Sequence, residues 1–272
     1  MSIRDAIATD LVVSPLGADV PAMVDVARCA EASGFDGVWT LDHFSGAMLD
    51  RPWSHEPFTV LGAMASVTDT VRIGPLVANM RNRHPAILAS AAASLQSLSQ
   101  GRAVIGVGSG AAPGSRFAGE QEAIGRLLGS GSERREYLIE TLAIVRQLFA
   151  GGGDHDGTHL HMHGLSGVVE PVPRPPLIVG ASGPLTVELA CHHADGVNIR
   201  VTPETGDLLR MANDLRSGSA FETSIWTELD TTHPLGGDAD DWVDLGVNRR
   251  TLAIAPPFDL DAVATIGARL NA

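Results

Sequence analysis

Short apolar runs alternate with longer amphipathic segments along most of the chain. The short runs are rich in Val, Ile and Leu and contain few polar residues, which is typical of strands that are buried on both faces. The longer segments repeat apolar residues at the spacing of one helix face, as Met23, Val26, Ala27 and Ala30 do. Strands that alternate with helices in this way predict parallel β-α-β units.

The pattern predicts eight strands, each followed by a helix. The predicted strands are 10–15, 38–41, 71–77, 103–107, 177–179, 197–199, 221–229 and 251–254, and the predicted helices are 19–34, 57–67, 85–98, 133–149, 184–193, 203–217, 240–245 and 259–270. Eight such units in 272 residues match the size of a closed (β/α)8 barrel, a TIM barrel. An open, doubly wound sheet is the alternative. Because no long linker divides the chain, we predict one α/β barrel domain over residues 1–272.

The segment GFDGVWTLDHF, residues 34–44, contains the first candidate for chemistry. Its buried strand is followed directly by Asp42 and His43, and α/β barrels carry their active sites at the C-terminal ends of strands. A carboxylate beside a histidine at such a place indicates chemistry, and a solvated turn is the alternative. By the same reasoning the other candidate strand ends are 76–79, 106–110, 180–183 and 198–200.

Charge and composition exclude several classes of function. The net charge is −13, and the 19 basic residues, all arginine, form no concentrated patch, so we expect neither nucleic acid nor a membrane as a partner. Without lysine the chain has no Schiff-base lysine and no Walker A lysine. No apolar run is long enough to span a membrane, the N-terminus lacks a signal-peptide core, and Cys29 and Cys191 resemble core thiols, so we expect a cytoplasmic protein.

Three further patterns favour structural explanations. Gly106, Gly108 and Ala111 match a loose dinucleotide-binding pattern, but Pro113 follows where a Rossmann loop would open its helix. The histidines at 155, 159, 161 and 163 lack accompanying cysteines, so a solvent-facing hairpin is favoured over a metal site, and we predict no metal. No serine lies in a G-x-S-x-G motif, so we predict no serine hydrolase.

Four segments together resemble the bacterial-luciferase-like flavin and deazaflavin oxidoreductases. They are GFDGVWTLDHF, RNRHPAILASAAASLQSLSQGR, AVIGVGSG, and PPLIVGASGP with ADGVNIR downstream. The Asp42-His43 pair with Trp53 and the sequence HEPF at 55–58 is most similar to the branch that uses coenzyme F420, a deazaflavin. The resemblance implies hydride transfer between C5 of this cofactor and a small organic substrate. The alternatives are an FMN-dependent monooxygenase that needs a flavin reductase and oxygen, and a cofactor-binding protein without turnover.

The resemblance also implies roles for individual residues. His43 would be the proton donor or acceptor on the substrate side of the cofactor ring, and Trp53 or Trp39 would line the substrate pocket. The bond Leu76-Val77 would be a non-proline cis peptide beneath the ring. The implied cofactor-binding residues are Asp42, Leu76, Val77, Ala78, Asn79, Gly108, Ser109, Ser182, Gly183, Leu185 and Thr186, of which the last four would hold a phosphate at a helix N-terminus.

Two departures from the family pattern bear on the substrate. Sugar-phosphate and alcohol dehydrogenases of this kind carry a glutamate directly after the glycines of the fourth strand, where this chain has Ala111. The lysines that grip a substrate phosphate also have no counterpart. Both departures weigh against a phosphorylated sugar and against alcohol oxidation by an acid–base pair. Dimers are common in the family, so we expect a homodimer.

Overall fold

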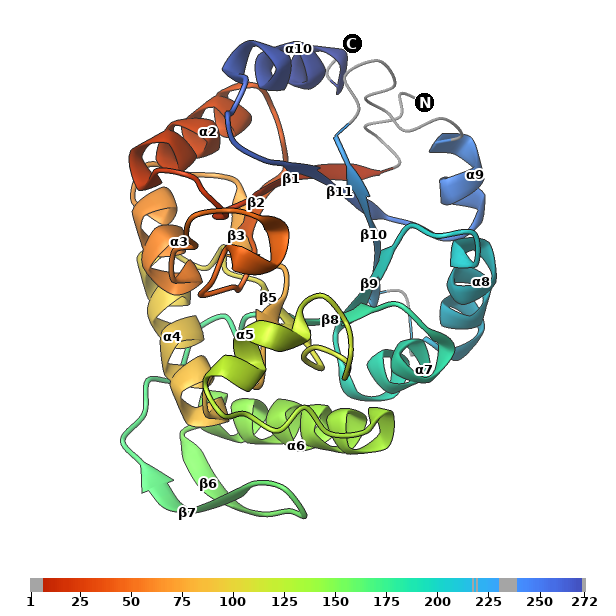
Figure 1. Cartoon of the computed structure of the whole chain (residues 1–272). Helices are drawn as coiled ribbons and strands as arrows, with labels where there is room; N and C mark the ends of the chain where they lie inside the picture. Colours follow the sequence, from red (N-terminus) through yellow and green to blue (C-terminus); the bar gives the residue numbers. More distant parts are fainter. Residues whose placement is uncertain (1–6, 217, 219, 230–238, 271–272) are drawn as a thin grey trace.

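The computed structural model describes residues 7–216, 218, 220–229 and 239–270, and it shows a ring of strands surrounded by helices (Figure 1). The strands of the ring are β1 (Ala8–Val13), β2 (Gly37–Thr40), β3 (Arg72–Pro75), β4 (Ala78–Asn79), β5 (Ile105–Gly108), β8 (Leu177–Ala181), β9 (Gly196–Arg200), β10 (Glu222–Glu228) and β11 (Arg249–Ile254). The surrounding helices are α2 (Val20–Ala32), α3 (Pro57–Ala65), α4 (Pro85–Leu98), α6 (Gly131–Phe149), α7 (Pro184–His193), α8 (Thr205–Leu215), α9 (Ala239–Asp244) and α10 (Leu260–Leu270).

The sheet is parallel throughout and closes into a barrel. Its strand order is β3-β2-β1-β11-β10-β9-β8-β5-β4, and the two end strands, β3 and β4, are consecutive in the chain. They are therefore one barrel strand interrupted between Pro75 and Ala78, so that β3 pairs with β2 while β4 pairs with β5. The prediction of a (β/α)8 barrel is confirmed, and the open-sheet alternative is wrong.

Local sequence determines where the helices begin. Four helices, α2, α3, α4 and α7, have a proline in their first turn, where its missing N–H costs no hydrogen bond. Helix α6 begins with a capping box in which Ser130 and Glu133 satisfy each other's backbone N–H groups. These two signals mark the starts of five of the eight predicted helices, and the other three, α8, α9 and α10, form without either signal.

The interruption between β3 and β4 contains the cis peptide bond Leu76-Val77 that the family resemblance implies. The side chain of Val77 reaches inward to positions occupied by glycine on β5 and β8. A Cβ at Gly108 would lie 2.5 Å from Val77 Cγ2, and a Cβ at Gly180 would lie 2.8 Å from Val77 Cγ1. A Cβ at Gly106 would lie 2.5 Å from the carbonyl oxygen of Pro75. The strand-five glycines thus serve close packing in the barrel interior rather than a Rossmann loop.

Charged side chains fill the N-terminal end of the barrel. Arg249 contacts Asp10 at 2.5 Å and Glu222 at 3.4 Å, and Arg72 contacts Glu222 at 2.6 Å. Trp39 Nε1 donates a hydrogen bond to Asp10 Oδ2 at 2.8 Å. Burial raises the pKa of Asp10 from 3.8 to about 6, although Arg249 and Trp39 oppose that rise.

Two further regions contain regular structure outside the eight barrel units. The connection after β5 contains a short helix, α5 (Ala118–Ala123), and the histidine-rich segment predicted as a hairpin forms the strands β6 (Gly152–Asp156) and β7 (His161–Ser166). The hairpin projects from the barrel beside α6 (Figure 1). In the described part of the chain, no three His, Cys, Asp or Glu residues are arranged to hold a metal ion, and no helix could cross a membrane. Residues 1–6 lie outside the described residues, so the N-terminal signal-peptide prediction is untested.

Because Val77 lies so close to Gly108, we predict that a methyl group added at position 108 destabilises the folded protein. We expect Gly108→Ala to lower the free energy of unfolding by about 1–3 kcal/mol, because the new Cβ would overlap a stiff, branched side chain. Gly119→Ala is the control, since nothing lies within 4 Å of its Cβ position. Urea unfolding of both variants, and of Gly108→Ala in a Val77→Ala background, measures this. A loss that is undiminished by Val77→Ala would contradict the explanation.

The raised pKa of Asp10 leads us to predict that the stability of the protein depends on pH. Its folded-state pKa of about 6 lies above its unfolded value, so the folded protein binds the proton more tightly, and this contribution to stability is lost as the pH rises from 4 to 7. We expect the free energy of unfolding of the wild type, relative to Asp10→Asn, to fall by up to about 3 kcal/mol over that range. Asp25→Asn, which removes an exposed carboxylate, should show no such trend. A constant difference between wild type and Asp10→Asn would refute this.

Candidate active site

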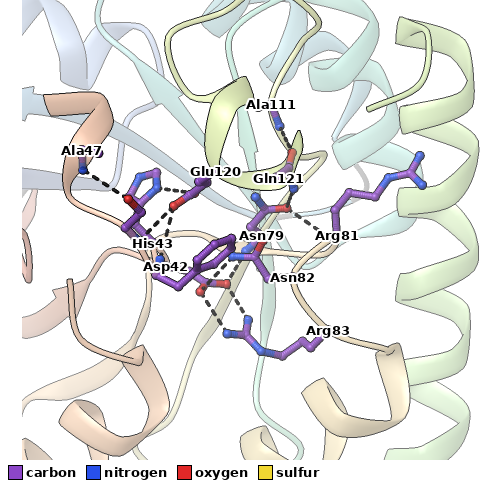
Figure 2. Close-up of polar contacts among 12 residues, drawn as sticks. Asp42, His43, Ala47, Asn79, Arg81, Asn82, Arg83, Ala111, Glu120 and Gln121 are labelled. Carbon is purple, nitrogen blue, oxygen red and sulfur yellow. Dashed lines mark hydrogen bonds and ion pairs between the residues drawn. The ribbon is translucent and has the colours of Figure 1, made fainter. Parts of the chain in front are cut away.

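Polar side chains from three consecutive strand ends meet at the C-terminal end of the barrel (Figure 2). Asp42 and His43 follow β2, Asn79 ends β4 and leads into the segment up to Arg83, and Glu120 and Gln121 come from α5, in the connection after β5. Strand order alone makes these segments neighbours, because β2 and β5 flank the interrupted strand β3-β4. The structure therefore assembles one connected network from segments up to 77 residues apart.

His43 is paired with a buried carboxylate. Its Nδ1 lies 2.7 Å from Glu120 Oε1, and the side chain of Glu120 is only 1% exposed. The other oxygen of Glu120 accepts N–H groups from the backbone of Phe44 and Ser45, each at 3.3 Å. The ring of Phe117 stacks against the imidazole with 5.5 Å between centroids. Since a carboxylate only accepts, Nδ1 donates its hydrogen, and Nε2 is the nitrogen left for a substrate.

Asp42 is held by the segment that follows β4. Arg83 donates to both oxygens, at 2.5 and 2.9 Å, and the backbone N–H of Asn79 donates at 2.7 Å. The side chain of Asn82 lies 3.4 Å from Oδ1. Burial alone would lower the pKa of Arg83, but the hydrogen bond and charge of Asp42 outweigh it and raise that pKa. These four contacts use the acceptor capacity of Asp42, which fixes the loop rather than leaving a free carboxylate.

Gln121 connects α5 to both neighbouring strand ends. Its Nε2 donates to Asn79 Oδ1 at 3.0 Å, and its Oε1 accepts the backbone N–H of Ala111 at 3.1 Å. Asn79 Oδ1 also accepts the N–H of Arg81 at 3.0 Å. Glu120 directly precedes Gln121 in α5. The contacts that dock α5 on the barrel therefore also position Glu120, the partner of His43.

The predicted phosphate turn lies at the end of β8. Ser182 and Gly183 precede α7, whose N-cap residue Gly183 makes no side-chain capping bond, and a Cβ at Gly183 would meet nothing within 4 Å. Leu185 in the first turn is 54% exposed. A helix N-terminus without a side-chain cap is suited to an anion, although the N–H groups of Thr186 and Val187 already donate to the carbonyl oxygen of Gly183. The structure thus keeps the four residues Ser182, Gly183, Leu185 and Thr186 together as a possible anion site.

The two tryptophans predicted for the substrate pocket lie in different places. Trp39 is 1% exposed and packs inside the barrel beneath Leu76, with its indole N–H bonded to Asp10, so the expectation that it could line an open pocket is wrong. Trp53 is 47% exposed and donates its Nε1–H to the carbonyl of Ala18 at 3.0 Å. Its neighbour in the same connection, Phe44, is 42% exposed. Trp53 is therefore the tryptophan available at the rim.

Sequence reasoning missed Glu120 and Arg83. Glu120 lies in a stretch rich in glycine and flanked by Pro113, which reads as a loop, and no local pattern indicates that it returns to His43. Arg83 lies within RNRHP, a segment that indicates family resemblance but no contact for this arginine. Its pairing with Asp42 follows from strand order, which the motif alone does not reveal.

Residues 5–222 match the family described as luciferase-like monooxygenase. The chain belongs to that family. A 5,10-methylenetetrahydromethanopterin reductase of Archaeoglobus fulgidus is 28% identical over 210 residues, which are 74% of this chain and 58% of the relative. An F420-dependent glucose-6-phosphate dehydrogenase of Beutenbergia cavernae is 34% identical over 175 residues, 61% of this chain and 48% of the relative. The chain thus spans about half the length of these curated relatives.

Solved structures confirm the fold. An F420-dependent secondary alcohol dehydrogenase in complex with an F420-acetone adduct superimposes with a TM-score of 0.78 at 18% identity, covering 99% of this chain and 98% of the other. The coenzyme F420-dependent tetrahydromethanopterin reductase of Methanopyrus kandleri gives 0.77 at 17% identity, covering 97% and 98%. At such identities the comparison establishes the shared barrel.

Proposed function

We propose that this protein is an oxidoreductase that uses coenzyme F420 and transfers a hydride between C5 of the deazaflavin and a small organic substrate. The observation that carries the proposal is the His43-Glu120 pair at the C-terminal end of the barrel, on the strand next to the inward-facing Val77. The pair supplies a positioned proton beside the place where the family resemblance expects the cofactor ring. The names of the F420-dependent relatives support the same cofactor.

The residues at the barrel end fit a flat ring with an anionic tail. Val77 presents an apolar surface, and the strand beside it ends at Gly108 and is followed by Ser109, both of which carry little side-chain bulk. The uncapped turn at Ser182 and Gly183 offers N–H groups to a phosphate without requiring a lysine. We place Leu76, Val77, Ala78 and Asn79 along the ring, with Asp42 acting through the loop that it holds.

His43 is the proposed proton carrier. When bound, the deazaflavin supplies or accepts the hydride at C5 and thereby determines the reaction class. In the reducing direction, His43 Nε2 gives a proton to the substrate atom that needs one, and the ring recovers a proton from water afterwards. Positioned acids of this kind contribute about 10²–10⁴-fold to rate.

Glu120 is a positioning residue in this proposal. Its carboxylate holds Nδ1–H of His43, which fixes both the ring orientation and the tautomer and keeps Nε2 directed away from Glu120. The two backbone N–H groups on Oε2 hold the carboxylate itself in place.

The cofactor is tested by fluorescence titration of the purified protein with F420 and, separately, with FMN. We expect F420 to bind more tightly and reduced F420 to be reoxidised by unsaturated acceptors without oxygen consumption. Tighter FMN binding with oxygen uptake in the presence of a flavin reductase would indicate a monooxygenase instead. Tight F420 binding without turnover of any acceptor would indicate a cofactor-binding protein, and binding of neither would contradict the proposal. Sedimentation in the same buffer tests the predicted homodimer.

The role of Glu120 is tested by its alanine variant. We expect Glu120→Ala to shift His43 from the Nδ1–H towards the Nε2–H tautomer in ¹⁵N NMR spectra, because Nδ1 loses its acceptor. We expect kcat to fall by about 10- to 100-fold, as for other partners that orient a functional histidine, with the Kd for F420 unchanged. His43→Ala identifies the resonance and should lower kcat by about 10²–10⁴-fold.

Glu122→Gln is the matched control for this test, because Glu122 lies on the same short helix but is exposed. It should leave both the spectrum and kcat as in the wild type. If Glu120→Ala lowered kcat without changing the tautomer of His43, the carboxylate would act in some way other than by positioning the ring.

A further inference from the structure

The inward-facing side of the barrel can be followed strand by strand at its C-terminal end. Gly180 faces Val77 across the interior, and it pairs in register with Asn198, which pairs with Ser224. Asn198 Nδ2 donates to Ser224 Oγ at 2.9 Å, as expected for neighbours on one face. Because side chains alternate along a strand, the residues two positions further face the same way. On β9 that residue is Arg200.

The guanidinium of Arg200 lies over the ring of Trp226, its partner in register on β10. The guanidinium carbon is 4.6 Å from the centre of the indole ring. Trp226 itself packs against the apolar cluster in the barrel interior, which contains Val12, Trp39, Leu76, Val104, Ile178 and Ala253. The stacking on a ring that is fixed from below holds the exposed guanidinium at the mouth of the barrel.

The surroundings of Arg200 differ from those of Arg72, Arg249 and Arg83. Arg72 and Arg249 at the opposite end are paired with Glu222 and Asp10, and Arg83 is paired with Asp42. Among the described residues, no carboxylate lies within ion-pair distance of Arg200. Within the part of the chain that the structure describes, Arg200 is therefore an exposed guanidinium without a carboxylate partner, in a protein whose net charge is −13.

We propose that Arg200 binds the acidic group of the substrate, so that the substrate is a small organic acid. This inference rests on the proposed function, because it assumes that a substrate lies at the mouth of the barrel. In the ring of strands, β9 lies directly opposite β2, which carries His43. An acid bound through Arg200 would extend across the barrel towards Nε2 of His43. The exposed rings of Phe44 and Trp53, on the side of His43, would receive its apolar part.

The geometry favours a carboxylate as the recognised group. A guanidinium binds a carboxylate through two parallel hydrogen bonds, one to each oxygen. A neutral amide or ester lacks the negative charge and does not offer two equivalent acceptor oxygens. The anionic tail of the cofactor is the other possible source of the same chemistry. The test therefore separates the substrate from the cofactor.

The test uses trans-cinnamate and cinnamamide, two planar probes of nearly equal size that differ in charge. Their Kd values are measured by calorimetry with the F420-loaded wild type and with Arg200→Gln and Arg200→Lys. We expect the wild type to prefer the acid, and Arg200→Gln to weaken cinnamate binding about 10- to 100-fold, as for loss of a hydrogen-bonded charge. Cinnamamide binding should change less than about twofold. Arg200→Lys should retain part of the preference for cinnamate over cinnamamide, because lysine keeps the positive charge but cannot form two parallel hydrogen bonds to a carboxylate.

Arg210→Gln is the matched control, since Arg210 is exposed on α8 and paired with Asp207. It should not alter the affinity for cinnamate. Equal cinnamate binding by the wild type and Arg200→Gln, or binding of neither probe at millimolar concentration, would overturn the proposal.

A second comparison separates cofactor from substrate. If Arg200→Gln weakened F420 binding but not binding of the deazaflavin ribityl fragment without its anionic tail, Arg200 would serve the cofactor, and the proposal would be wrong. If the wild type bound no F420, the proposed function would fail, while the cinnamate comparison on the same cofactor-free protein would still decide whether Arg200 selects an acid.

Discussion

The packing of Val77 into the centre of the barrel determines where the site residues lie. Its side chain faces Gly108 and Gly180 so closely that neither position has room for a Cβ. The same interruption ends β3 and restarts the strand as β4, which pairs with β5 through Ala78 and Asn79. The backbone N–H of Asn79 then binds Asp42. Every later contact, from Asp42 to Arg83 and from Asn79 to α5, depends on this displacement of the chain.

The two ends of the barrel use charge differently. At the N-terminal end, Asp10, Arg72, Glu222 and Arg249 form closed ion pairs beneath a layer of apolar side chains, so their charges serve the fold. At the C-terminal end, His43 offers one ring nitrogen beyond its contact with Glu120. This division agrees with the general finding that barrel enzymes place stability and catalysis at opposite ends.

Much of the barrel could be predicted from the sequence because its signals are local. Apolar runs mark the strands, and prolines and a capping box mark the helix starts. The site was only partly predictable, because its contacts join residues that are distant in the chain. His43 could be chosen from its place after a strand, whereas Glu120, 77 residues later in a glycine-rich connection, could not. The family resemblance implies Trp39 as the alternative to Trp53, and only the burial of its side chain in the barrel interior shows that it belongs to the core.

The carboxylate that pairs with His43 comes from a connection between barrel strands, and this affects how substrate specificity can change. The sugar-phosphate and alcohol dehydrogenases that the chain resembles carry a glutamate directly after the β5 glycines, where this chain has Ala111. Here Glu120 comes from α5, and α5 is docked through the contacts of Gln121 with Asn79 and Ala111. The orientation of His43 is therefore tied to the loops after β4 and β5, not to a barrel strand. Since Val77 and its glycines belong to the strands, the connections can vary with the substrate while the surface proposed for the cofactor ring stays the same.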